Sequence, residues 1–282
     1  MKSVILHCVR RVARSAPRLR SAMIPGALVV MAAAIAALSP VGLAAASASD
    51  RDAAAASAVP VATSFAGTTA VGALFAVVKN GVRHFCTAAV VHSPHGNVVI
   101  TAAHCLEGRR VGPKGDVFFE PGYHNGTSPK GRWTVMAEFV DRSWQKDHDP
   151  NDDVAFLTVG RRAHRVQAEV GSERLVIATK LPRTVQVIGY PDNSNTPIEC
   201  TAPARPLHLA GYRQMVFDCG GYTDGTSGGP FLMDVSKSTG AGEVIGVIGG
   251  YQEGGDLASI SYSARLLQNV AALYRQAAAW RP

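Results

Sequence analysis

A single serine lies in a glycine-rich stretch of this 282-residue chain. The stretch GGYTDGTSGGPF covers residues 220–231, with Gly225 two positions before Ser227 and two glycines directly after it. Glycine tolerates positive φ and lets the backbone approach another molecule closely. The same residue types also form ordinary surface turns. The stretch alone therefore fits a plain turn as well as a nucleophile surrounded by accessible N–H groups.

Two other stretches supply the partners that a nucleophilic serine needs. In VVITAAHC, His104 ends an apolar run, and in NDDVAFLTV, Asp153 directly precedes one. A serine hydroxyl becomes reactive when an imidazole accepts its proton, and a buried carboxylate holds that imidazole in the right tautomer. The set His104, Asp153 and Ser227 therefore predicts acyl transfer, with the N–H groups of Gly225 and Ser227 forming an oxyanion hole.

The elements that must position these residues look like strands. From residue 71 onward, short runs rich in β-branched residues alternate with Gly, Pro, Asn and Asp. About twelve such runs favour an all-β sandwich or a pair of barrels. One helix is expected at the end of the chain, where apolar residues recur at spacings of three and four. Its predicted face, which should dock on a barrel, contains Leu266, Leu267, Val270, Leu273 and Tyr274.

Residues 1–48 read as a signal peptide. They contain a basic start, an apolar run over residues 27–38 and the small residues Ala46-Ser47-Ala48, which fit a cleavage site. A membrane anchor is the alternative, but Ser39-Pro40 ends the apolar run early for a span of about 20 residues. We expect a secreted protein with no stable membrane insertion after signal cleavage, and a linker or short pro-segment over residues 49–70.

The basic balance of the chain belongs to this leader. The net charge is +7, but six of the 28 basic residues and none of the 21 acidic ones lie in residues 1–48. The remainder is close to neutral, so no nucleic-acid partner is expected. Protein or peptide substrates and a monomeric state are the expectations instead.

Four of the five cysteines lie outside the leader, at positions 86, 105, 200 and 219. An even number in an exported chain favours two disulfides. Three pairings are possible, and joining sequence neighbours, Cys86–Cys105 and Cys200–Cys219, is the simplest. A zinc site is the alternative, but no CxxC spacing supports it.

Three blocks in order, TAAHC, DVAFL and GTSGGP, resemble the signature blocks of chymotrypsin-like (trypsin-fold) serine proteases. The resemblance covers residues 71–282 and implies two six-stranded antiparallel β-barrels with the site between them and a C-terminal helix. We expect barrel one at about 71–160, barrel two at about 175–262 and the helix at about 263–280. By resemblance, His104 is the general base, Asp153 the orienting acid and Ser227 the nucleophile. Cys86–Cys105 matches the disulfide beside the family's histidine.

Asp152 is the rival for the acid, but the family places it directly before the apolar strand, which favours Asp153. Asp147, Asp149 and Asp152 also raise the possibility of a calcium loop. The glycine and glutamate of an EF-hand are missing, so a solvated acidic loop is the better interpretation. The mechanism itself requires no metal and no organic cofactor.

The chain departs from trypsin-like members at Thr226, where they carry an aspartate that pairs with a new N-terminal amine. Members similar to bacterial glutamyl endopeptidases and HtrA-type proteases lack that aspartate too, and VIGVIGGY before the last helix resembles the secreted bacterial branch. A catalytically silent binding protein on the same scaffold is the alternative to a serine endopeptidase, and a non-proteolytic esterase is a third reading.

The resemblance gives no charged specificity residue. Gly221 stands where Lys- or Arg-specific members carry aspartate, and Ile248 where glutamate-specific members carry histidine. An uncharged P1 residue is therefore expected, although Glu253 and Asp256 could favour a basic one. The residues expected to shape the substrate pocket are Gly221, Tyr222, Gly249, Gly250 and Tyr251.

Overall fold

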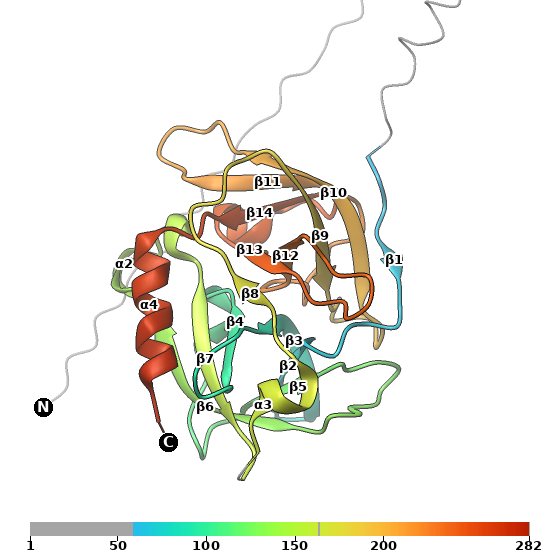
Figure 1. Ribbon diagram of the computed structural model, residues 1–282, viewed down its shortest axis with the longest axis vertical. Helices are drawn as coiled ribbons and strands as arrows, with labels where there is room; N and C mark the ends of the chain where they lie inside the picture. The colour runs from blue at the N-terminus through green and yellow to red at the C-terminus, as the bar shows by residue number, and fades with distance from the viewer. Residues whose placement is uncertain (1–58, 163, 282) are drawn as a thin grey trace, which may run out of the picture. The chain divides into compact units, whose positions relative to one another are not determined.

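The computed structural model describes residues 59–162 and 164–281. These residues form two β-structures that lie one above the other, with helix α4 along one side (Figure 1). The predicted signal peptide lies outside the described residues. Within the described part, no helix has the length and hydropathy needed to cross a membrane.

The first β-structure is a closed six-stranded barrel with the order β2-β3-β4-β7-β6-β5. All its strand pairs are antiparallel. Its interior is filled by large side chains such as Leu74, Phe119 and Trp133, none of which is exposed to solvent. The strands are β2 (Val71–Val78), β3 (Gly81–Val90), β4 (Val98–Thr101), β5 (Val117–Pro121), β6 (Trp133–Val140) and β7 (Ala155–Gly160).

The second β-structure is an eight-stranded sheet in the order β14-β11-β10-β9-β12-β13-β8, with β1 also paired to β10. Val187, Phe217 and Phe231 are fully buried in its core. The strands are β1 (Thr63–Ser64), β8 (Arg174–Leu175), β9 (Arg183–Gly189), β10 (Ile198–Pro206), β11 (Gln214–Asp218), β12 (Pro230–Met233), β13 (Glu243–Val247) and β14 (Ile260–Ala264).

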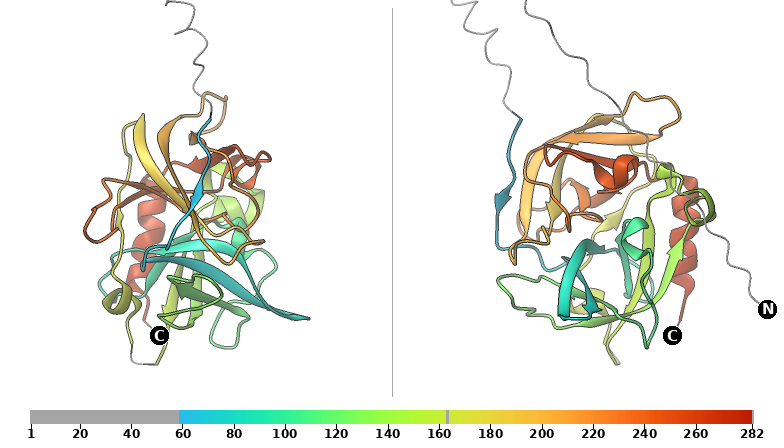
Figure 2. Two further views of the ribbon diagram at one scale, coloured as in Figure 1. Left: turned by 90° about the vertical axis from the view of Figure 1, so that its right-hand side faces the viewer. Right: turned by 180° about the vertical axis from the view of Figure 1, so that it is seen from behind.

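The predicted all-β, chymotrypsin-like fold with a C-terminal helix is confirmed, and the first β-structure is the expected six-stranded barrel. The second, called barrel two below, differs from the expected six-stranded barrel because its eight strands form a half-barrel that does not close, and two of these strands are short additions. β1 comes from the segment predicted as a linker and pairs with β10, while β8 adds in parallel to β13. The described part of the 49–70 segment therefore starts against barrel two (Figure 2) and reaches barrel one at Ala70, whose C=O accepts the N–H of Val90.

The C-terminal helix α4 (Gln268–Ala279) begins later than the expected residue 263. Ser263 and Ala264 pair with β11 instead, as the end of β14. Val270, Leu273 and Ala277 are buried, and the helix packs against β6 and β7. The end of the chain therefore crosses from barrel two to barrel one and covers its outer surface. The other helical segments are η1 (His104–Leu106), α2 (Arg142–Asp147), η2 (Pro150–Asp152), α3 (Val166–Val170) and η3 (Tyr251–Gly254).

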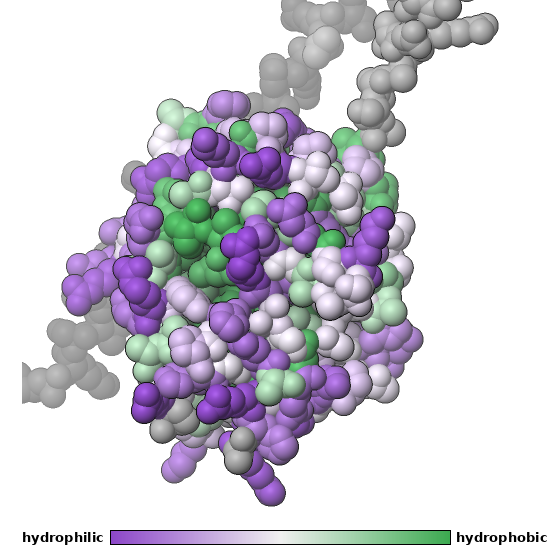
Figure 3. Space-filling model, viewed as in Figure 1, coloured by the Kyte–Doolittle hydropathy of each residue, from purple (hydrophilic) through white to green (hydrophobic). Residues whose placement is uncertain are grey.

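The face shown in Figure 3 is mostly hydrophilic, with an apolar depression between the upper end of α4 and β13. Isolated apolar area of this kind is common on soluble proteins.

Candidate active site

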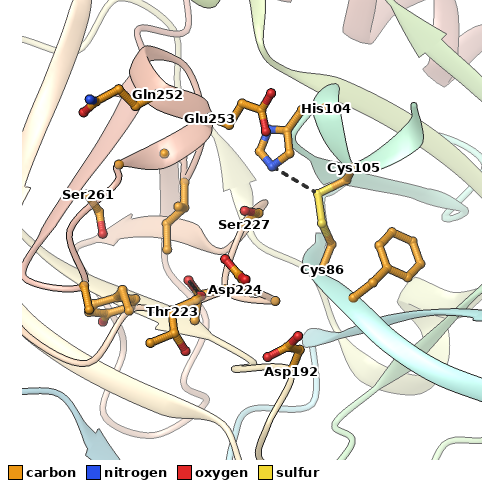
Figure 4. A pocket seen from close by; sticks show the side chains of 18 of the residues that line it. Cys86, His104, Cys105, Asp192, Thr223, Asp224, Ser227, Gln252, Glu253 and Ser261 are labelled. Carbon is orange, nitrogen blue, oxygen red and sulfur yellow. Dashed lines mark hydrogen bonds between the residues drawn. A yellow bond between two sulfur atoms is a disulfide. The ribbon is translucent and has the colours of Figure 1, made fainter. Parts of the chain in front are cut away.

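A cleft of about 720 Å³ is lined by residues from both β-structures. His104 and Cys105 come from η1 after β4, and Ser227 comes from the loop that leads into β12. Figure 4 shows His104 and Ser227 on the wall of the same cleft. Two residues 123 positions apart in the sequence are therefore brought together by the packing of one barrel on the other.

Strand pairing places His104 beside Asp153. In the antiparallel ladder of β4 and β7, Thr101 lies opposite Ala155, so the residues just after β4 meet those just before β7. Asp153 is fully buried. Its Oδ1 accepts the backbone N–H of His104 at 2.9 Å, and its Oδ2 lies 2.8 Å from Nδ1 of the imidazole.

This contact sets the state of the imidazole. Because an ionised carboxylate only accepts hydrogen bonds, Nδ1 carries the proton and Nε2 is left to act as a base. Burial lowers the pKa of His104, but the charge of Asp153 and its hydrogen bond outweigh burial and raise the pKa above the usual 6.5. Nε2 lies 3.9 Å from Sγ of Cys105. No hydrogen bond joins it to Ser227 within the described residues, and such catalytic contacts often tighten only when substrate binds.

Asp152, the alternative acid, faces away from the imidazole. Its Oδ2 accepts the hydroxyl of Ser143 at 2.5 Å, and its Oδ1 accepts the side-chain amide of Asn269 in α4. Of the two neighbouring carboxylates, Asp153 is therefore the one in contact with His104.

The loop before Ser227 presents two N–H groups with fixed directions. In a trans peptide the C=O and N–H point to opposite sides, so holding one fixes the other. The C=O of Asp224 accepts the N–H of Asp192 at 2.8 Å, and the C=O of Thr226 accepts the N–H of Gly229 at 2.9 Å. The opposite ends of these two peptides are the N–H groups of Gly225 and Ser227, for which the described residues provide no acceptor.

Only glycine fits at position 225. Its φ is +89°, in the region that side chains rarely adopt, and an added Cβ would lie 2.5 Å from the backbone nitrogen of Asp192. The direction of the Gly225 N–H therefore depends on the glycine that the sequence places there.

Thr226 is buried and hydrogen-bonded locally. Its hydroxyl donates to the C=O of Thr223 at 2.7 Å, and its N–H donates to the same carbonyl at 3.1 Å. Its side chain packs on Gly189, where an added Cβ would meet it at 2.7 Å. The loop is thus ordered without a charge at this position.

The structure contains two disulfides, Cys86–Cys105 and Cys200–Cys219. This is the pairing of sequence neighbours, and it leaves no thiolate at these positions to bind zinc. The first disulfide lines the cleft next to His104, which ties the imidazole's segment to β3.

Of the five residues expected to shape the substrate pocket, only Tyr222 lines the cleft. Gly250 donates its N–H to Oδ2 of Asp153 at 2.7 Å, and a Cβ on Gly249 would lie 2.9 Å from the same oxygen. Gly250 therefore binds the carboxylate of Asp153, and Gly249 leaves the space that this carboxylate occupies. The N–H of Tyr251 is directed to Gln214 instead. Gly221 is likewise absent from the lining.

Other lining residues were not predicted to shape the pocket, among them Ile248. Together with the predicted Tyr222, Ile248 is buried and gives the cleft an uncharged inner wall. Exposed carboxylates stand around it, together with one arginine. The sequence indicated this acidic lining in part, since Glu253 and Asp256 follow β13 closely. The acidic lining residues are Asp192, Asp224, Glu253 and Asp256, and the arginine is Arg109.

The chain is similar to a known protein family. The model of the trypsin-like peptidase domain matches residues 86–247, a range that contains His104, Asp153 and Ser227. No curated protein matches the chain.

Three solved structures are similar in fold. The protease Anisep from Arthrobacter nicotinovorans has 24% identity and a TM-score of 0.66, covering 78% of this chain and 100% of that chain. The thermostable serine protease AL20 from an extremophilic microorganism has 22% identity and a TM-score of 0.64, covering 76% and 99%. A Glu endopeptidase in complex with MPD has 15% identity and a TM-score of 0.59, covering 78% and 98%.

Proposed function

The chain belongs to the trypsin-like peptidase family and has the chymotrypsin-like fold, and from this premise we propose that it is a secreted serine endopeptidase whose acyl-enzyme forms on Ser227. The observation that carries the proposal is the contact between His104 and the buried carboxylate of Asp153 at the wall of the cleft that Ser227 also lines. The substrates are proteins or peptides, and the protein acts as a monomer after removal of residues 1–48.

In the first half of the reaction, Ser227 Oγ attacks the carbonyl carbon of the scissile bond while Nε2 of His104 takes the hydroxyl proton. Asp153 stabilises the imidazolium through Nδ1. The negative charge on the carbonyl oxygen is met by the N–H groups of Gly225 and Ser227, and one such donor contributes about 3–4 kcal/mol to transition-state stabilisation. The imidazolium then protonates the leaving amine, and the C–N bond breaks.

In the second half, water replaces the amine. Nε2 of His104 removes a proton from the water as it attacks the ester carbonyl, and returns that proton to Ser227 Oγ when the acyl group leaves. The uncharged wall formed by Tyr222 and Ile248 supports an uncharged P1 residue.

The alternative, a silent binding protein, depends on the idea that the serine loop is disordered when Thr226 replaces the family's aspartate. The hydrogen bonds from Thr226 to Thr223 argue against this alternative, because they order the loop without an ion pair. Catalysis is therefore the reading that the geometry supports best.

A fluorophosphonate probe tests the proposal, since it reacts with an activated serine. We expect labelling of the folded wild type and none of Ser227→Ala. His104→Ala should fold and lose labelling, because Oγ then has no base. Ser238→Ala, on an exposed loop, is the matched control and should label fully. Labelling of Ser227→Ala, or none of the wild type, would overturn the proposal.

A further inference from the structure

Thr87 of β3 contacts the serine loop from the opposite barrel. It directly follows Cys86 of the disulfide beside His104 and is fully buried. Its backbone N–H donates to the C=O of Ser227 at 2.7 Å. Its hydroxyl donates to the C=O of Gly225 at 3.0 Å. A single residue of barrel one thus holds the loop on both sides of Thr226.

The direction of the Thr87 hydroxyl is fixed by its own surroundings. Its oxygen accepts the N–H of Tyr190 at 2.9 Å, which turns the hydroxyl proton toward Gly225. The C=O of Thr87 accepts the hydroxyl of Thr101 at 2.8 Å. All the backbone and side-chain polar groups of Thr87 are therefore engaged, as buried polar groups require.

The held carbonyl belongs to the peptide between the two oxyanion donors. Its C=O, on Gly225, is bound by Thr87, and its N–H, on Thr226, is bound by the carbonyl of Thr223. As a glycine, residue 225 has wide rotational freedom of its own. Without the Thr87 hydroxyl, rotation about ψ of Gly225 is restrained by fewer contacts, and the two donors no longer share one fixed orientation.

We propose that Thr87 is a positioning residue for the reaction: its hydroxyl keeps the Gly225 and Ser227 N–H groups aimed at the same point in the cleft. This inference rests on the proposed function. Because Thr226 is uncharged, no ion pair at this position can restrain the loop. The hydrogen bond from Thr87 restrains it from outside instead. Because pre-aimed donors act on the transition state more than on bound substrate, the effect belongs in kcat.

The test compares Thr87→Val, which keeps the shape but removes the hydroxyl, with Thr87→Ser, which keeps the hydroxyl. With a peptide substrate and active sites titrated, Thr87→Val should lower kcat by about tenfold to a hundredfold with KM within about twofold. Thr87→Ser should stay within about threefold of the wild-type kcat. A merely structural role would lower the melting temperature and leave the kcat of the folded fraction unchanged.

Thr158→Val is the matched control. Thr158 is equally buried in barrel one, and its hydroxyl has no partner among the described residues, so kcat should not change. If Thr87→Val does not fold, Thr87→Ala removes the same hydroxyl without adding a methyl group. A wild-type kcat for the folded hydroxyl-free variant overturns the inference. An inactive wild type, or an active Ser227→Ala, overturns the proposed function instead.

Discussion

At the scale of single residues, the hydrogen bond between His104 and Asp153 should set the pH range of the proposed reaction. Only the neutral imidazole can accept the serine proton, and the pKa of His104 is raised above 6.5. We therefore expect kcat/KM to fall as the pH drops through a value above 6.5. In Asp153→Asn the loss of the carboxylate charge should move this acidic limb to lower pH and reduce kcat, as pH–rate profiles would show. His148→Ala, which changes an exposed histidine, should leave the profile in place.

Glu173 gives stability its own pH dependence. It is fully buried, and burial raises its pKa to about 7, although Oε2 accepts the N–H of Gly242. A raised pKa means that the stabilisation is complete below the unfolded value of 4.5 and is lost as the pH rises through about 7. Glutamine is neutral throughout. Between pH 4.5 and pH 8 the wild type should therefore lose stability that Glu173→Gln keeps. The difference in unfolding free energy, variant minus wild type, should rise by about 3 kcal/mol over this range.

Urea titrations at the two pH values would measure this difference. Asp234→Asn, an exposed acidic residue changed in the same way, should keep a constant difference from wild type. A pH-independent difference for Glu173→Gln would mean that Glu173 titrates normally.

Sequence reasoning could propose His104, Asp153 and Ser227 because each stands beside an apolar strand in a pattern that the chemistry requires. It did not locate Thr87, since a threonine inside an apolar strand looks like part of the core. Its partners, Gly225 and Tyr190, depend on how the barrels pack, which local patterns do not contain. Gly249 and Gly250, which were expected to shape the pocket, do not line the cleft. The N–H of Gly250 donates to Asp153, a contact between distant segments that local patterns do not contain either.

At the scale of elements, the two disulfides should contribute equally to stability but differently to kcat. Each joins residues 19 apart, so each should stabilise the fold by about 3 kcal/mol in the chain-entropy model. Replacing Cys200 and Cys219 by serine should lower the unfolding free energy by about that amount and keep kcat within about threefold. Replacing Cys86 and Cys105 should also lower kcat, because that bond flanks His104. Urea unfolding and kcat together test this, and an equal loss of kcat in both variants would contradict it.

Strand positions followed well from the alternation of short apolar runs and turn residues. The start of α4 did not, because the residues before it have both helical spacing and the β-branched or aromatic neighbours of a strand. Pairing with β11 decides the matter for Ser263 and Ala264. The parallel addition of β8 to β13 is equally a tertiary choice, since a two-residue strand carries almost no periodicity.

At the scale of the whole molecule, charge is distributed unevenly around the cleft. Four acidic residues line the cleft, namely Asp192, Asp224, Glu253 and Asp256. Among the described residues that line it, Arg109 is the only lysine or arginine. Such a lining attracts cations and is screened by salt. Peptides with the same P1 residue should therefore be cleaved with higher kcat/KM when lysine rather than glutamate flanks the bond.

This preference should shrink as ionic strength rises and in the double variant Glu253→Gln/Asp256→Asn. Peptides with neutral flanks provide the control and should respond little to salt. A preference for glutamate flanks at low salt would contradict the prediction. The net charge of the chain gave no hint of this local field, because most of its excess lies in the leader.

The hydrogen bonds from Thr226 to Thr223 join residues only three positions apart. Such a contact forms with the fold itself and makes no use of a liberated amino group. Recombinant protein that keeps an affinity tag ahead of residue 59 should then turn over substrate as purified, with no maturation protease added to the assay.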